Sequence, residues 1–303
     1  MTLKLGKLTI LPESGRVLKL EPVSGLNVLW SNPHQGPDAR GWINPGGDRT
    51  WLSPERDLFL PEGVWTSYKV PASIDPGRHE IMEYSSKRIL LKNRIEALFF
   101  RQKASVGLTL TKCITETSPE IPEVEASAGY NIETRLRVEG TLPPDVFPAI
   151  WNIIQLPQGG KIFFKGKSPV SYFGLPNWKR EANGLCSVEI PAEKESYKTG
   201  IAAVESQGVM AYLNATAEKP FLVVRKFEVH SKGLYFDAPA DKPGSPCVQQ
   251  IFSDNGAEGG FGEMEYHSDA LTPEKTEIVD RCSTMAFVAE KKILEKMLEQ
   301  LFS

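Results

Sequence analysis

The chain has 303 residues, of which 41 % are hydrophobic and 24 % are charged, and its formal net charge at pH 7 is -3. Its 35 basic residues are interspersed with 38 acidic ones, so no basic stripe for nucleic acid is formed, and no apolar run approaches the length of a membrane span. We therefore expect a globular protein with an apolar core that binds neither nucleic acid nor membrane.

The amino terminus and the cysteines bear on the cellular compartment. The opening sequence, MTLKLGKLTILPESG, lacks a basic segment followed by an apolar stretch and a small-residue cleavage site. The cysteines are far apart and include no Cys-x-x-Cys pair; they are Cys113, Cys186, Cys247 and Cys282. These features predict a cytoplasmic location with reduced thiols.

Strand patterns recur along the whole chain. In residues 129–139, Ile132, Thr134, Leu136 and Val138 alternate with charged residues, and this period of two is typical of a half-buried antiparallel strand. Similar β-rich runs are predicted at 16–20, 105–112, 149–156, 208–214, 220–229 and 283–288.

The segments between these runs are rich in turn-forming residues. The chain contains 25 Gly and 23 Pro, many of them in clusters such as NPGGD, LPQGG and APADKPGSP, which favour turns and loops. No internal repeat and no long linker divides the chain. We therefore predict an all-β fold in a single domain over residues 1–303.

One segment, residues 289–303, has helical periodicity. Ile293, Leu294, Met297 and Leu298 form an apolar stripe opposite Lys and Glu residues. We expect a short C-terminal helix that caps the sheet edge, with a contact to a second copy of the chain as the alternative. The oligomeric state is left open.

The segment GGFGEMEYHSD, residues 259–269, places three ionisable residues in one strand. If residues 261–267 are extended, Glu263, Glu265 and His267 share one face, about 7 Å apart at each step. Three ionisable groups make an unfavourable core, so this face is a solvated surface, a sugar or catalytic site, or a metal site. Close carboxylates can separate their pKa values and act as acid and base, whereas the spacing does not fit familiar zinc motifs. We predict no metal.

A second segment, residues 44–57, combines Arg49 and Trp51 with Glu55 behind a Gly-Gly turn. Guanidinium donors reach sugar hydroxyls, and an indole covers the apolar face of a sugar ring. The alternative is a structural turn with Trp51 in the core. Gly46 and Gly47 lack the Lys-Ser/Thr of a phosphate-binding loop.

Other candidates are weaker. His79 and His230 are interpreted as a surface residue and a strand-end residue, and Lys198 as a solvated charge. The strand at 149–156 offers Asn152 and Gln155 as polar groups. No G-x-S-x-G segment is present, so no serine nucleophile can be assigned.

The order of four short motifs carries a resemblance. GGDRTWLSPE near residue 50, WNIIQLP near 151, YKTG near 197 and FGEMEYHS near 261 together resemble aldose-1-epimerase-like proteins of the galactose-mutarotase-like superfamily. The resemblance implies a β-supersandwich that binds a small-molecule carbohydrate across one sheet and needs no cofactor.

The resemblance also implies roles for particular residues. Arg49 matches the arginine that grips the sugar, Glu263 the base that takes the proton of the anomeric hydroxyl, and Glu265 a polar partner of that base. The family's middle strand carries a histidine that protonates the ring oxygen, but the matching strand here has Asn152 and Gln155. Neither amide can be a general acid near neutral pH. Either His79, His230 or His267 replaces the histidine, or the protein binds sugar without mutarotase chemistry.

Three functions remain open at this stage. The first is an isomerase of the aldose 1-epimerase type, with Glu263 and Glu265 as catalytic residues and with Arg49, Trp51, Asn152, Gln155 and His267 binding the substrate. The second is a sugar-binding or sensing protein without turnover. The third is a carbohydrate lyase or hydrolase on a related sandwich, since a fold does not determine chemistry. We also predict that Arg49 and Glu263 converge in one cleft.

Overall fold

A computed structural model describes all residues except 35, 39–40, 175–177, 181–183 and 192–195. The described residues form two large antiparallel sheets stacked face to face, which confirms the predicted all-β fold. No helix in the described part of the chain is both long enough and apolar enough to cross a bilayer.

The first sheet has nine described strands and carries the candidate site. In spatial order its strands are β1 (Leu3–Leu5), β2 (Leu8–Leu11), β3 (Arg16–Leu20), β4 (Asp48–Ser53), β9 (Ala149–Pro157), β18 (Phe261–His267), β17 (Gln249–Ser253), β14 (Tyr197–Ile201) and β11 (Val170–Phe173).

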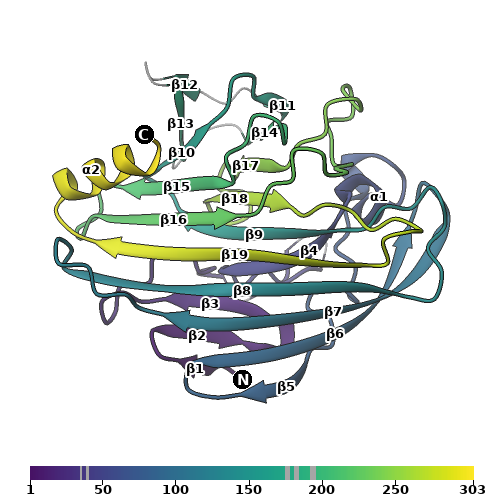
Figure 1. The fold of residues 1–303 in the computed structure, drawn as a ribbon, viewed down its shortest axis with the longest axis horizontal. Helices are drawn as coiled ribbons and strands as arrows, with labels where there is room; N and C mark the ends of the chain where they lie inside the picture. Colours follow the sequence, from purple (N-terminus) through teal and green to yellow (C-terminus); the bar gives the residue numbers. More distant parts are fainter. Residues whose placement is uncertain (35, 39–40, 175–177, 181–183, 192–195) are drawn as a thin grey trace.

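The second sheet has ten described strands, of which β6, β7, β8 and β19 are long and lie side by side in Figure 1. In spatial order its strands are β12 (Trp178–Arg180), β13 (Leu185–Glu189), β10 (Lys161–Lys165), β15 (Val209–Asn214), β16 (Phe221–Phe227), β19 (Glu277–Val288), β8 (Ala126–Glu139), β7 (Ala104–Thr117), β6 (Arg88–Phe99) and β5 (Glu80–Tyr84).

Every strand run predicted from the sequence lies within or beside one of these strands. In β8 the alternation has the predicted result, because Ile132 and Leu136 are buried between the sheets while Arg135 and Arg137 are exposed. The main apolar core fills the space between the sheets, where Ile154 and Met264 of the first sheet meet residues such as Ile114 of the second.

The C-terminal helix forms as expected but lies elsewhere than predicted. Helix α2 (Lys291–Leu301) buries Leu294 and Leu298 against Leu222 and Val224, on the outer face of β16. The prediction that it caps a sheet edge is therefore wrong, since β16 lies inside the sheet. The helix covers outward apolar side chains of β16, and Figure 1 shows α2 beside the ends of β15 and β16.

Three short helical turns lie in the loops: η1 (Pro12–Ser14), α1 (Glu55–Phe59) and η2 (Trp65–Ser67). Helix α1 follows β4 directly, so the chain leaves the first sheet and passes over its outer face before β5 begins in the second sheet. This crossing segment covers the face on which the candidate site lies.

Candidate active site

The residues of β4, β9 and β18 divide between the two faces of the first sheet. Asp48 and Asn152 point inward and bond to the second sheet: Asp48 to Arg225 and to the hydroxyl of Tyr130, and Asn152 to Asp280. Because side chains alternate along a strand, their neighbours point to the opposite, outer face. That face carries Arg49, Trp51, Trp151, Gln155, Glu263, Glu265 and His267.

A pocket of about 420 Å³ opens on this outer face. Its walls are mostly aromatic, and the aromatic residues are Trp42, Trp51, Trp65, Tyr68, Trp151, Phe173, Phe252 and Phe261. Its charged lining residues are Arg49, Glu55, Lys198, Glu258, Glu263 and Glu265. Such a lining of flat apolar surfaces with a few polar groups suits a small ligand that has both apolar faces and hydroxyls.

Arg49 and Glu263 meet in this pocket, although they lie far apart in the sequence. The Arg49 Nη2 donates to Glu263 Oε1 at 2.9 Å, and Gln155 Nε2 donates to the same oxygen at 2.9 Å. Burial alone would lower the pKa of Arg49, but the Glu263 and Asp75 carboxylates raise it. The predicted convergence of Arg49 and Glu263 is confirmed, and the pair places the Glu263 carboxyl group in the pocket wall.

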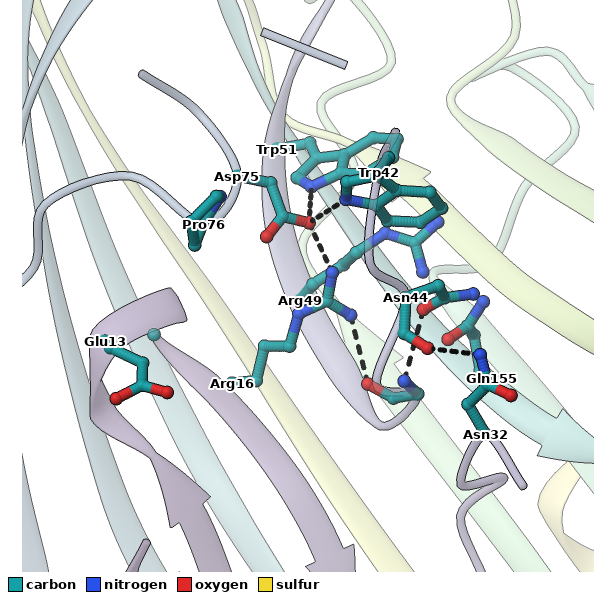
Figure 2. Close-up of polar contacts among 12 residues, drawn as sticks. Glu13, Arg16, Asn32, Trp42, Asn44, Arg49, Trp51, Asp75, Pro76 and Gln155 are labelled. Carbon is teal, nitrogen blue, oxygen red and sulfur yellow. Dashed lines mark hydrogen bonds and ion pairs between the residues drawn. The ribbon is translucent and has the colours of Figure 1, made fainter. Parts of the chain in front are cut away.

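Asp75 fixes the orientation of two tryptophans in the wall. Figure 2 shows its carboxylate accepting hydrogen bonds from Trp42 Nε1 at 3.3 Å and Trp51 Nε1 at 3.0 Å, and pairing with Arg16. The Arg49 guanidinium then lies 4.2 Å from the centre of the Trp51 ring, a cation–π distance. One carboxylate thus positions the indoles against which the Arg49 guanidinium packs.

The Gly-Gly turn before β4 allows this arrangement because both glycines have positive φ. A Cβ on Gly46 would lie 2.3 Å from the Trp30 carbonyl oxygen, and one on Gly47 would lie 2.3 Å from that of Val17. The tight turn also exposes the Gly46 carbonyl, which accepts a hydrogen bond from Arg16 Nη1 at 3.0 Å. The turn is therefore structural and links β4 to the Arg16–Asp75 pair.

Glu265 belongs to a second cluster of charges, centred on Lys198. The Lys198 Nζ lies 3.1 Å from Glu265 Oε2 and 3.0 Å from Glu55 Oε2, and Trp151 Nε1 donates to Glu265 Oε2 at 2.8 Å. Lys198 is only 4 % exposed, so its interpretation as a solvated charge is wrong. Burial would lower its pKa, but the two carboxylates raise it.

The predicted site residues fall into three groups. Arg49, Trp51, Glu263 and Glu265 line the pocket. Gln155 stands behind Glu263 and bonds to it, and His267 stacks on the far side of Trp151, with ring centres 5.6 Å apart. Asn152 lies on the other face of the sheet, so the structure does not bring it to the pocket.

Glu263, Glu265 and His267 are all buried, at 5 %, 0 % and 2 % exposure. The alternative of a solvated strand face is therefore wrong. Burial lowers the pKa of His267 to about 4, so its ring is neutral at pH 7, and neither ring nitrogen has a hydrogen-bond partner among the described residues. Within the same described part, no three His, Cys, Asp or Glu side chains are grouped to hold a metal ion.

The two other candidate histidines lie outside the pocket lining. His79 contacts the carbonyl oxygens of Glu13 and Pro76 near the β5 side of the fold, and burial lowers its pKa to about 4. His230 follows β16, where its amide bonds to Tyr235. Sequence reasoning missed Trp42, Trp65, Tyr68 and Asp75, whose loops carry no periodicity that would indicate a site.

Comparison with known proteins supports the fold. No protein-family model and no curated protein matches the chain in sequence. A structure from Escherichia coli K12, provisionally assigned as an aldose 1-epimerase, matches 94 % of this chain and 97 % of its own with a TM-score of 0.55 at 11 % identity. A similarly assigned structure from Klebsiella pneumoniae covers 97 % of this chain and 79 % of its own, with a TM-score of 0.55 at 11 % identity.

A galactose mutarotase-like protein from Clostridium acetobutylicum matches 94 % of both chains, with a TM-score of 0.52 at 10 % identity. The class of fold is therefore the galactose-mutarotase-like β-supersandwich, as the motif resemblance implied. At this level of identity the likeness concerns the fold, and the chemistry has to be argued from the pocket itself.

Proposed function

We propose that the pocket binds a monosaccharide and that the protein is an isomerase of the aldose 1-epimerase type. The observation that carries this proposal is the Glu263 carboxylate, held by Arg49 and Gln155 in the wall of an aromatic pocket. The tryptophan faces can stack on the apolar face of a sugar ring, while carboxylate oxygens accept its hydroxyls.

The reaction needs only proton transfers. Glu263 takes the proton of the anomeric hydroxyl while an acid protonates the ring oxygen, so the C1–O5 bond breaks and an open-chain aldehyde forms. Rotation about C1–C2 and closure on the other face of the carbonyl give the opposite anomer. Arg49 and Gln155 keep the base in position.

A second candidate is a sugar-binding protein without turnover. It is favoured by β9, whose outward-facing positions carry Trp151, Ile153 and Gln155 and offer no histidine as a proton donor. The aromatic walls would serve binding in either case, so the two candidates differ only in proton transfer.

Magnetisation exchange between sugar anomers in NMR spectra, beside calorimetric binding, tests the proposal. The wild type should accelerate exchange for at least one of a panel including glucose and galactose. Glu263→Gln keeps the shape and loses the base, so exchange should fall roughly 10²–10⁴-fold while binding persists. Glu299→Gln, on the exposed side of α2, is the matched control and should change neither.

Binding without acceleration in the wild type would favour the second candidate. Neither binding nor acceleration for any sugar in the panel would contradict both.

A further inference from the structure

Lys198 lies between two carboxyl groups that come from distant parts of the chain. Glu55 is at the start of α1, Lys198 is in β14, and Glu265 is in β18. All three are almost fully buried, at 6 %, 4 % and 0 % exposure. We call these three residues the Lys198 cluster.

With both carboxyls ionised, the Lys198 cluster would hold two negative charges against one positive charge. Among the described residues that line the pocket, the other cation is Arg49, and it is already paired with Glu263. An unbalanced charge in a buried site has a high desolvation cost, and the cluster becomes neutral when one carboxyl binds a proton.

The surroundings of the cluster reinforce this effect. Asp237 receives hydrogen bonds from the Glu55 amide and Gln250 Nε2. Its pKa is lowered: burial opposes ionisation, but the charge of His267, present only when that ring is protonated at low pH, the charge of Lys198 and these donors outweigh it. The pKa values of both Glu55 and Glu265 are raised: burial raises them, the Lys198 ammonium lowers them, and the neighbouring carboxylates, Glu263 among them, raise them again.

The geometry indicates which carboxyl offers the proton to a ligand. Glu265 Oε2 is held by Lys198 and Trp151, but Oε1 is buried without a hydrogen-bond partner among the described residues. Glu265 lines the pocket two residues from Glu263 on the same strand face. A proton on Glu265 Oε1 has no acceptor among the described residues, so a ligand in the pocket can accept it while Glu263 acts as the base.

We propose that Glu265, with Lys198 and Glu55 behind it, is the proton donor to the sugar ring oxygen, in place of a histidine. This rests on the proposed function. The Glu265 carboxyl gives its proton to O5 as the C1–O5 bond breaks, and Glu263 receives the proton of the C1 hydroxyl. Ring closure returns the O5 proton to Glu265 and the Glu263 proton to O1, so each turnover leaves the enzyme unchanged.

Lys198 and Trp151 act as positioning residues in this scheme. After the proton leaves, the Glu265 carboxylate keeps the Lys198 ammonium and the Trp151 N–H as partners on Oε2. Charge-assisted hydrogen bonds of this kind stabilise the ionised form, which makes the proton easier to release in the transition state.

The first test measures the proton directly and needs no turnover. Infrared spectra of wild type with ¹³C-labelled glutamate should show a protonated carboxyl band at pH 7 that is absent from Glu265→Gln. Glu55→Gln balances the charges of Lys198 and Glu265, so the band should be absent at pH 7 in this variant and return at lower pH. Absence of the band in wild type would overturn the proposal.

The second test follows anomer exchange against pH. Glu265→Gln should lower kcat roughly 10²–10⁴-fold, and Glu55→Gln should move the loss of activity on the alkaline side to lower pH. A residue with a merely structural role would not move this profile. Glu299→Gln is again the control.

Failure of the proposed function and failure of the donor role of Glu265 give different results. A wild type that exchanges no sugar overturns the proposed function and the donor role together, even if the infrared band is present. Exchange that survives in Glu265→Gln with an unchanged pH profile overturns the donor role alone.

Discussion

The Asp75 carboxylate provides a quantitative test of how the pocket wall is held. Asp75 is 5 % exposed and its partner Arg16 is fully buried. Replacement by alanine leaves the guanidinium without a counter-charge and leaves the indole N–H groups of Trp42 and Trp51 without an acceptor. Breaking a buried ion pair from one side costs about 3–5 kcal/mol, so Asp75→Ala should lower the free energy of unfolding by about that amount.

Equilibrium unfolding in urea measures this change. Asp75→Asn should lose less, because its amide oxygen can still accept one indole N–H while the charge is gone. Asp75→Leu combined with Arg16→Met removes both charges and should recover much of the loss. Asp145→Ala, at an exposed turn, is the control and should stay within about 0.5 kcal/mol of wild type. An Asp75→Ala protein as stable as this control would refute the reasoning.

Three further predictions concern backbone, pH and domain organisation. Gly47→Ala should destabilise by more than about 1 kcal/mol in urea, because φ is +79° and the new Cβ would meet the Val17 carbonyl oxygen; wild-type stability would contradict this. The pKa of His267 is lowered by burial to about 4, so the unfolded state binds its proton first as pH falls. The free energy of unfolding should decrease as the pH falls from about 6.5 to 4, and His267 should account for about 3 kcal/mol of this at most. If His267→Gln shows the same dependence of unfolding free energy on pH, His267 is not the cause. Thermal unfolding followed by circular dichroism should give a β-rich spectrum and one transition, whereas two transitions would contradict a single domain.

The strands were predictable because their signal is local. Period-two alternation predicted a strand at residues 129–139, which lies within β8, and the strand considered at residues 261–267 is β18. The position of α2 was not predictable in the same way, because its apolar stripe shows that one face is buried but not which strands it covers.

The candidate site was predictable only in part. Arg49 and Glu263 were found through motif order, but Lys198 was not, since a lysine is usually solvated and its partners Glu55 and Glu265 become visible only when distant strands align. Asn152 and Gln155 are three positions apart in β9, so strand alternation alone allows only one of them to face a ligand. Applied to the sequence alone, this rule would have shown that Asn152 and Gln155 cannot both bind the same ligand.

Because β9 lies between β4 and β18, one of its two edges stays unpaired until late in the synthesis of the chain. β4 and β9 leave the ribosome well before β18, and until residues 261–267 arrive β9 is an edge strand with Trp151 on its face. The growing chain therefore carries an incomplete, aromatic half-pocket through much of its synthesis. We expect chains truncated before residue 261 to associate through this unpaired edge, so that solubility in the cell depends on completing the last strands of the sheet.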